Sequence, residues 1–245
     1  MIKLRPGDPP ASLTPERVRT LTDKFKQDGK PVWKQRWLRD ALLALSNGKC
    51  CYSECRLDES GAFLEVEHFW PKSLYPEAVL RWSNLLPCSK TCNGRKGDWD
   101  TKARPIIHPC YDDPRDHLEL RAFRFYAKTE KGANTLEATD INDHTYFATP
   151  RARLAFEILD DLEALAKFCQ HLTPTQATQQ ARPLQKQLVS RLRWGRPEEP
   201  YAAIISTSIL TSPALPTIRT AFEQWGLWNM EHEELIYAMR QISYE

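Results

Sequence analysis

Five of the seven cysteines lie in two short clusters, and they are the strongest chemical signal in the sequence. Cys50, Cys51 and Cys55 form the first cluster, and Cys88 and Cys92 follow about thirty residues later. In a reducing compartment such clusters bind metal more often than they form disulfides. Two thiolate pairs fit a tetrahedral zinc ion with four sulfur ligands, which would hold together two loops of low apolar content.

A second group of polar residues lies between the clusters and just after them. Residues 64–72 read Leu-Glu-Val-Glu-His-Phe-Trp-Pro-Lys and place Glu67 and His68 at the end of an expected strand. Asn84 lies in an expected loop, and Asn93 opens an expected helix. A Glu-His pair alone is more often a surface pair than a catalytic one. The pair is significant here because a carboxylate, an imidazole and two side-chain amides occur in a fixed order along the chain together with the cysteines.

This frame resembles HNH endonucleases of the type found as the nuclease subunit of Septu anti-phage systems, and similar nucleases accompany some retrons. In these nucleases two short strands and a helix surround one divalent ion. The likeness covers about residues 30–160. The stretches that carry it are Lys-Cys-x-Tyr at 49–52, Val-Glu-His-Phe-x-Pro-Lys-Ser at 66–73, Trp-x-Asn-Leu-Leu at 82–86, Cys-Asn-x-x-Lys-Gly at 92–97, and the segments 105–114 and 140–159.

The resemblance implies a role for each motif residue. His68 is expected to be the general base, because a neutral imidazole accepts a proton from water at physiological pH. Glu67 and Asn93 are expected to hold a catalytic Mg²⁺ or Mn²⁺ ion through oxygen atoms. Asn84 is expected to hydrogen-bond the loop and fix the orientation of His68. Two further residues, Arg95 and Lys96, are expected to bind phosphate.

The cysteine spacing departs from this family in both clusters. The family's second cysteine usually follows the first by three residues, and Ser53 occupies that position here. We therefore predict structural zinc on Cys50, Cys55, Cys88 and Cys92, with Cys51 as an alternative ligand. The second pair also has one extra residue between its members. A site with three ligands and a site without metal remain alternatives.

Strand geometry raises a question about the catalytic pair. Adjacent residues of an ideal strand point to opposite faces, so Glu67 and His68 can address one phosphate only where the strand ends or bends.

The elements around these residues predict an α+β fold that is mainly helical. A small ββα-metal (HNH) core held by zinc would lie between N-terminal helices and a C-terminal helical region. The expected divisions are a helical arm at 1–48, a nuclease core with zinc knuckles and a following irregular segment at 49–149, and a helical partner-binding region at 150–245. The first helix is expected from Pro15 to about 27, with Thr14 as its N-cap and Asp28-Gly29 as its end. Further helices are expected from Pro31 to about 45, and at about 150–168, 174–193, 198–210, 214–226 and 231–243. A strand is expected at 62–69 and a hairpin near Gly132.

Composition limits the class of protein. Apolar residues make up 41% and charged residues 27%, the net charge is only +2, and no apolar run is long enough for a membrane span or a signal peptide. We expect a cytoplasmic protein with a modest basic patch at 90–104, and structural roles for Cys110 and Cys169. The resemblance implies a nucleic-acid substrate and an ATPase partner with ABC- or SMC-like character. A stand-alone restriction-type nuclease and a non-catalytic zinc-binding module are the alternatives.

Overall fold

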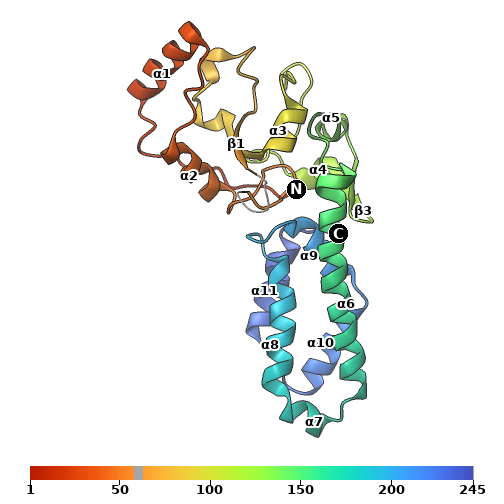
Figure 1. Cartoon of the computed structure of the whole chain (residues 1–245). Helices are drawn as coiled ribbons and strands as arrows, with labels where there is room; N and C mark the ends of the chain where they lie inside the picture. The colour runs from red at the N-terminus through yellow and green to blue at the C-terminus, as the bar shows by residue number, and fades with distance from the viewer. Residues whose placement is uncertain (58–62, 245) are drawn as a thin grey trace. The chain divides into compact units, whose positions relative to one another are not determined.

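The computed structural model describes residues 1–57 and 63–244, which form two compact units (Figure 1). The N-terminal unit is Met1–Phe147 and the C-terminal unit is Ala148–Glu245. Both are rich in helices, and the strands belong to two small antiparallel sheets in the N-terminal unit. The predicted class, α+β and mainly helical, is confirmed.

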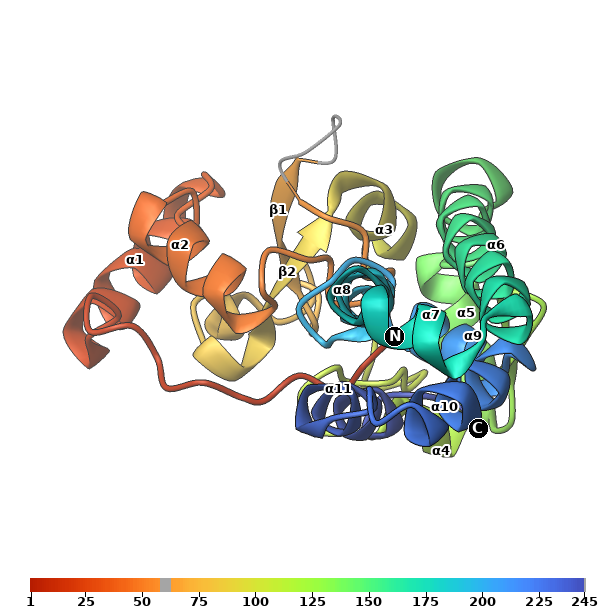
Figure 2. The ribbon, with the colours of Figure 1, turned by 90° about the horizontal axis from the view of Figure 1, so that it is seen from below.

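A two-stranded sheet followed directly by a helix forms the middle of the N-terminal unit. Strand β1 (Leu64–His68) pairs antiparallel with β2 (Leu85–Ser89), so that His68 lies opposite Leu85. Helix α3 (Lys90–Lys96) begins at the next residue, and the Ser89 hydroxyl caps it by accepting from the Cys92 amide. Figure 2 shows β1, β2 and α3 side by side. The strand prediction was correct from residue 64; Ala62, its expected first residue, lies outside the described residues.

The N-terminal helices pack their apolar faces against the chain that links the two strands. Helix α1 (Pro15–Asp28) has the predicted Thr14 cap and ends at Gly29, whose left-handed backbone (φ 67°) suits glycine. Helix α2 (Arg36–Leu45) was predicted to begin near Pro31, which is wrong. Residues 29–35 are not helical, and Trp33 lies in this connection. The shared core comprises Leu13, Val32, Leu38, Leu42, Val79, Leu80 and Leu85.

The second sheet lies where an irregular segment was expected. Short helices η1 (Pro76–Ala78), η2 (Trp82–Asn84) and α4 (Pro114–His117) precede a hairpin of β3 (Leu118–Arg121) and β4 (Arg124–Ala127). The prediction of a hairpin at Gly132 is wrong, because Gly132 lies in α5 (Glu130–Thr139). A Cβ at Gly132 would meet the His117 carbonyl oxygen at 2.1 Å, so this glycine serves close packing rather than a turn. The π-helix η3 (His144–Ala148) follows.

The described secondary-structure elements of the C-terminal unit are all helices. Its elements are α6 (Thr149–His171), α7 (Pro174–Gln179), α8 (Ala181–Leu192), η4 (Arg193–Gly195), α9 (Ala202–Thr211), α10 (Ala214–Gln224) and α11 (Met230–Arg240). Helix α6 packs against α8, α9 and α10, and α11 packs against α8 and α9. The predicted helices are confirmed with two corrections. The one expected at 174–193 breaks at Gln180, where α7 ends and α8 begins, and the one expected from about 198 begins only at Ala202.

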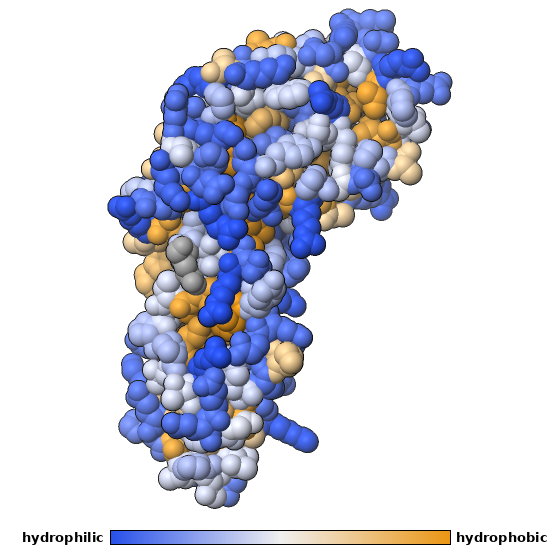
Figure 3. All heavy atoms as spheres, turned by 180° about the vertical axis from the view of Figure 1, so that it is seen from behind, coloured by the Kyte–Doolittle hydropathy of each residue, from blue (hydrophilic) through white to orange (hydrophobic). Residues whose placement is uncertain are grey.

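The surface carries hydrophobic residues in separate patches among hydrophilic ones, as the face drawn in Figure 3 shows. The described helices include none long and apolar enough to span a membrane.

Candidate functional site

The side chains of β1 alternate between two environments. Glu65 and Glu67 both reach α3: the Asn93 amide nitrogen Nδ2 donates to Glu65 Oε2 at 2.6 Å, and Lys96 Nζ lies 2.5 Å from Glu67 Oε1. Residues two apart on a strand share a face, and residues three apart on a helix are neighbours on one face, so the two pairs lie side by side. His68 is the last residue of β1, where strand alternation ends, and its ring contacts Trp33 and the Val79 carbonyl. A hydrogen bond and an ion pair between side chains thus hold α3 against β1.

His68 is held by a backbone carbonyl. Its Nε2 lies 3.0 Å from the Val79 oxygen, and because a carbonyl only accepts, Nε2 carries the proton and Nδ1 keeps its lone pair. The ring is 4% exposed and meets the Trp33 ring edge-on at a centroid distance of 4.7 Å. Burial, reinforced by the charges of Lys72 and Lys96, lowers the pKa of His68 to about 3. The imidazole is therefore neutral at physiological pH.

Asn84 organises the segment that carries the acceptor for His68. Its Oδ1 accepts from the Trp70 amide at 2.6 Å, and its Nδ2 donates to the carbonyls of Trp70 and Ala78 at 3.2 and 3.1 Å. Ala78 and Val79 are consecutive, so Asn84 and His68 bind neighbouring carbonyls of one segment. Asn84 is 1% exposed, which places it behind the site rather than on its surface.

Lys96 connects the carboxylate of Glu67 to the backbone of its neighbour. Its ammonium donates to the His68 carbonyl at 2.9 Å as well as contacting Glu67 Oε1. Burial raises the pKa of Glu67 to about 7, and the charge and hydrogen bond of Lys96 oppose this rise. The Lys96 side chain is 0% exposed. In this structure Lys96 therefore contacts Glu67 rather than solvent.

The other two predicted residues of α3 lie nearer the surface. Because a carboxylate only accepts, the bond from Asn93 Nδ2 to Glu65 orients the amide and leaves Asn93 Oδ1 available as a ligand. Arg95 is half exposed and pairs with Asp143 at 3.4 Å and Asp140 at 3.7 Å.

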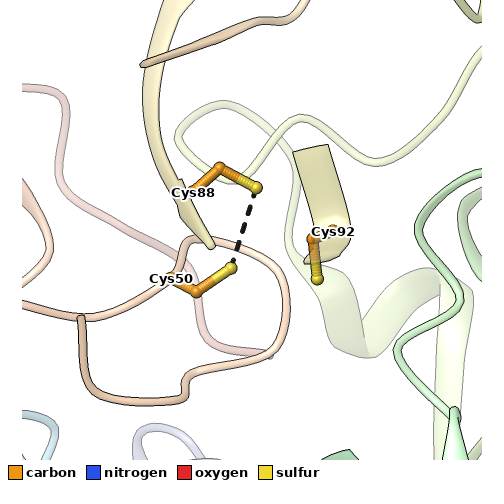
Figure 4. Close-up of side chains that lie close together, drawn as sticks. All are labelled: Cys50, Cys88 and Cys92. Atoms are coloured by element: carbon orange, nitrogen blue, oxygen red, sulfur yellow. Dashed lines mark hydrogen bonds between the residues drawn. The ribbon is translucent and has the colours of Figure 1, made fainter. Parts of the chain in front are cut away.

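Three cysteine sulfurs come together beside the sheet. Figure 4 shows Cys50 on its loop, Cys88 on β2 and Cys92 on α3, with the Cys50 and Cys88 sulfurs directed toward one another. We call these residues the sulfur cluster. All three are buried, their sulfurs lie within 4.8 Å of one another, and Cys50 Sγ is 3.8 Å from Cys88 Sγ. This distance is far beyond a disulfide bond, and all seven cysteines are free thiols.

The sulfur cluster could hold a metal such as zinc. Two sulfurs bound to one tetrahedral zinc ion at about 2.3 Å are separated by about 3.8 Å, and this is the Cys50–Cys88 distance. Burial raises the pKa of the Cys50 thiol, but hydrogen bonds from the surrounding thiols outweigh it and hold the pKa well below its ordinary value. One thiolate surrounded by thiol donors is the charge pattern that a cation would complete.

The remaining cysteines of the first loop lie close to this cluster. Cys55 is buried and accepts from the Ser53 hydroxyl at 3.2 Å, and its backbone carbonyl accepts from the Cys50 amide at 2.9 Å. Contact with Cys50, then burial, raises the pKa of Cys55. Burial also raises the pKa of Cys51. The three clustered sulfurs include Cys50 from this loop, so Cys55 and Cys51 stay the candidates for a fourth ligand.

Two further cysteines are buried elsewhere. Cys110 and Cys169 lie outside the sulfur cluster, and burial raises the pKa of each to about 11, as suits inert thiols.

Comparison with known proteins identifies the family. No protein-family model matches the chain. Over 245 aligned residues, 96% of this chain and 92% of the relative, it is 32% identical to a Septu protein PtuB from Bacillus thuringiensis. The chain belongs to the Septu PtuB family. A second Septu protein PtuB, from Bacillus mycoides strain KBAB4, is 24% identical over 184 residues, 58% of this chain and 62% of the relative. The suspected resemblance to the Septu family is thereby confirmed.

Within this PtuB-family chain the motif residues named from the sequence form one neighbourhood around β1 and α3. Two contacts in it were not anticipated. Glu65 binds Asn93, and Lys96 binds Glu67. The alternation Glu65-Val66-Glu67 was an available signal, because residues two apart on a strand share a face. No sequence signal indicated that the ammonium of Lys96 would be buried.

Proposed function

We propose that this PtuB-family chain is a metal-dependent HNH endonuclease that hydrolyses phosphodiester bonds of DNA or RNA. The observation that carries the proposal is the state of His68. Its ring is neutral and held at Nε2 by the Val79 carbonyl, so that Nδ1 is left as a proton acceptor. General base catalysis requires an imidazole that is oriented through one nitrogen and unprotonated at the other. Because burial is the main cause of the lowered pKa of His68, opening the site to water would bring that pKa back toward physiological pH.

In this proposal the residues of β1 and α3 have different roles in the reaction. His68 Nδ1 takes a proton from the attacking water. Glu67 and the free Oδ1 of Asn93 would hold a divalent ion, Mg²⁺ or Mn²⁺, which supplies charge to stabilise the phosphate and the departing oxygen. Asn84 positions the segment that orients His68, and Glu65 orients Asn93. Arg95, half exposed at the end of α3, would contribute to phosphate binding. Lys96, first expected to bind phosphate, is better suited to holding Glu67 in place.

Access to His68 is part of the same proposal. Because the ring is 4% exposed, a phosphate can reach it only when a covering residue moves. Trp33, in the connection between α1 and α2, contacts the ring edge-on and is the first candidate.

The sulfur cluster would bind structural zinc, with Cys55 or Cys51 as fourth ligand, and so fix the loop at 50–55 to β2 and α3. We further propose that the chain acts as the effector nuclease of an anti-phage defence complex with an ABC- or SMC-like ATPase subunit. The C-terminal unit, whose described elements include neither a strand nor a metal cluster, would supply the contact surface.

The test is His68→Ala in the purified full chain, alone and with the ATPase encoded beside it, on plasmid, single-stranded DNA and RNA with Mg²⁺ or Mn²⁺. Loss of a general base is expected to slow cleavage by roughly 100- to 10,000-fold. The exposed His171→Ala is the matched control and should cut like wild type. Undiminished metal-dependent cleavage by His68→Ala would overturn the mechanism.

A second candidate is a zinc-stabilised module that binds nucleic acid or a partner without cleaving. The burial of His68 and the Glu67–Lys96 pair favour it, because both also fit a purely structural role. Wild-type protein that contains zinc, binds no second metal and cuts none of the substrates in the presence of its partner would establish it.

A further inference from the structure

Aromatic and cationic side chains gather on the loops just beyond His68. The Trp70 indole lies 4.9 Å from the guanidinium carbon of Arg81 and 4.6 Å from Lys102 Nζ. The same ammonium lies 3.9 Å from the ring of Tyr75, whose centroid is 6.4 Å from that of Trp70. We call these four residues the Trp70 platform. They come from three separate stretches of chain, so the fold alone brings them together.

The Trp70 platform is fixed from below. Asn84 binds both the amide and the carbonyl of Trp70, which holds the backbone beneath the indole. The Tyr75 hydroxyl donates to Asp100 Oδ1 at 2.9 Å, and the Lys102 amide donates to the same oxygen at 3.0 Å. A rigid aromatic surface loses little conformational entropy when a ligand stacks on it.

The cations of the platform are available to a ligand. Arg81 and Lys102 are exposed, and neither forms an ion pair with a carboxylate in the part of the chain that the structure describes. A second tryptophan–arginine pair in the same unit differs in this respect. Trp99 donates its indole N–H to the Arg104 carbonyl at 2.8 Å, and the Arg104 guanidinium pairs with Glu137 at 2.7 Å. The hydrogen-bonding and charged groups of Trp99 and Arg104 therefore already have partners within the protein.

The platform lies beside the candidate catalytic residues. His68 binds the Val79 carbonyl, Asn84 binds the neighbouring Ala78 carbonyl, and Arg81 follows two residues after Val79. Trp70 itself is two residues after His68 along the chain. A nucleic acid whose phosphate reached His68 would therefore pass close to the platform.

We propose that the Trp70 platform binds an unpaired nucleotide of the substrate. The base would take a face of the indole that a cation now covers, and Arg81 and Lys102 would move to the flanking phosphates. Aromatic faces stack on every base, and stacking needs a base that is not enclosed in a duplex. The platform would thus direct this PtuB-family chain to single-stranded or locally unpaired nucleic acid. The inference rests on the proposed nuclease function and names the class of substrate.

Binding of a fluorescently labelled thymidine oligonucleotide and of a blunt duplex, measured by anisotropy with the full chain in a His68→Ala background, tests this. Trp70→Ala should weaken single-strand binding roughly 5- to 150-fold, the range for one base stacked on an aromatic ring. Trp70→Phe should restore most of the affinity. Trp99→Ala is the matched control and should bind like the parent. Equal affinities of Trp70→Ala and Trp99→Ala would overturn the proposal, as would a parent that prefers the duplex.

Photo-crosslinking gives a readout that does not depend on how a variant folds. An oligonucleotide with one 5-iodouracil in a single-stranded region should crosslink to the peptide that contains Trp70, and pairing that base should abolish the crosslink. Crosslinks confined to other peptides would refute the platform. If the crosslink forms but wild type cleaves no substrate, the nuclease proposal fails and the platform stands. If cleavage depends on His68 but the crosslink is absent, the platform proposal fails and the nuclease proposal stands.

Discussion

The two units are held together by different kinds of contact. Around β1 and α3 of the N-terminal unit, groups that prefer water are buried, among them the charged pair Glu67–Lys96 and the imidazole of His68. The C-terminal unit buries mostly aliphatic and aromatic side chains between its helices, with Leu188, Ile205 and Phe222 as fully buried examples. Among its described residues, the fully buried ionisable side chains are Arg151 and His232. Burying charge costs free energy unless each group finds a partner, whereas burying aliphatic surface contributes stability directly.

This difference indicates that the N-terminal unit has a requirement besides stability, namely the positioning of functional groups. A protein tolerates buried polar groups where they position chemistry or complete a metal site. The N-terminal unit brings together a sulfur cluster, an oriented imidazole and an oriented amide within one small sheet and helix.

Cys92→Ser should have the largest effect. Serine in place of one sulfur ligand weakens zinc binding, and the free energy of binding structural zinc is on the order of 10 kcal/mol, which is folding free energy for the loops it holds. Zinc content, measured by mass spectrometry of the native protein, should fall. Hydrogen exchange should accelerate in residues 50–55 and in α3 while α8 and α10 stay protected.

Cys169→Ser in α6 is the control for the sulfur cluster, because this cysteine lies outside it. Its zinc content should equal that of wild type. Full zinc occupancy in Cys92→Ser, or zinc loss in Cys169→Ser, would contradict the assignment of the metal to the sulfur cluster.

Lys96→Met should come next, because it leaves the Glu67 carboxylate buried without a partner. Removing one member of a buried ion pair costs about 3–5 kcal/mol, and both side chains here are almost fully buried. Denaturant unfolding of the N-terminal unit should show this loss. The double variant Glu67→Gln/Lys96→Met should recover much of it, because no charge stays buried. A Lys96→Met protein as stable as wild type would show that the pair contributes nothing.

Leu188→Ala should destabilise only the C-terminal unit. Leu188 is fully buried in α8, and truncating such a leucine costs about 3 kcal/mol through lost burial and the cavity left behind. Hydrogen exchange should accelerate in α8 and α11 without a change in zinc content. The exposed Leu74→Ala offers the comparison and should change stability by less than about 0.5 kcal/mol. Loss of zinc in Leu188→Ala would mean that the units do not behave independently.

The sequence predicted those features that depend on local pattern. Thr14 and Gly29 bound α1 because capping and left-handed backbone have strong residue preferences. The β3–β4 hairpin was missed because its turn uses Ala122 and Phe123 at positive φ (43° and 65°), where Gly or Asn is usual. The start of α2 was misjudged because Trp33, Trp37 and Leu38 continue a helical spacing that the chain adopts only from Arg36.

The candidate site was predicted by motif and not by geometry. The order of Glu67, His68, Asn84 and Asn93 was visible in the sequence, but their partners were not. The burial of His68 under Trp33 depends on a packing contact between distant segments. The choice among the sulfurs of the first loop depends on its backbone turn, where Glu54 has a positive φ of 62°. Spacing alone leaves such choices open.

The smallest predicted effect compares His68 with a second buried histidine, His232 in α11. His232 is 0% exposed, and its Nδ1 accepts from the Asn229 amide as part of the helix cap. Burial lowers the pKa of His232 below its ordinary value of about 6.5. As pH falls below that value the unfolded chain takes up a proton first, so the stability of the folded unit decreases by at most about 1.4 kcal/mol per pH unit. The protection factors of the α11 amides, which correct the exchange rates for the slower intrinsic exchange at lower pH, should therefore fall between neutral and mildly acidic pH.

His232→Gln should remove this dependence and keep the cap, since glutamine is a natural partner at this position of a capping box. The protection factors in α11 should then change little with pH, while those in β1, next to His68, should keep their dependence. The exposed His171→Gln should alter neither. If α11 of His232→Gln responds to acid as strongly as wild type, the response belongs to another group, and burial of an imidazole is not what makes the C-terminal unit sensitive to pH. His68 would then be the better candidate for a buried histidine whose protonation changes the stability of the folded protein. The two units would in that case differ in their response to acid as well as in the groups that they bury.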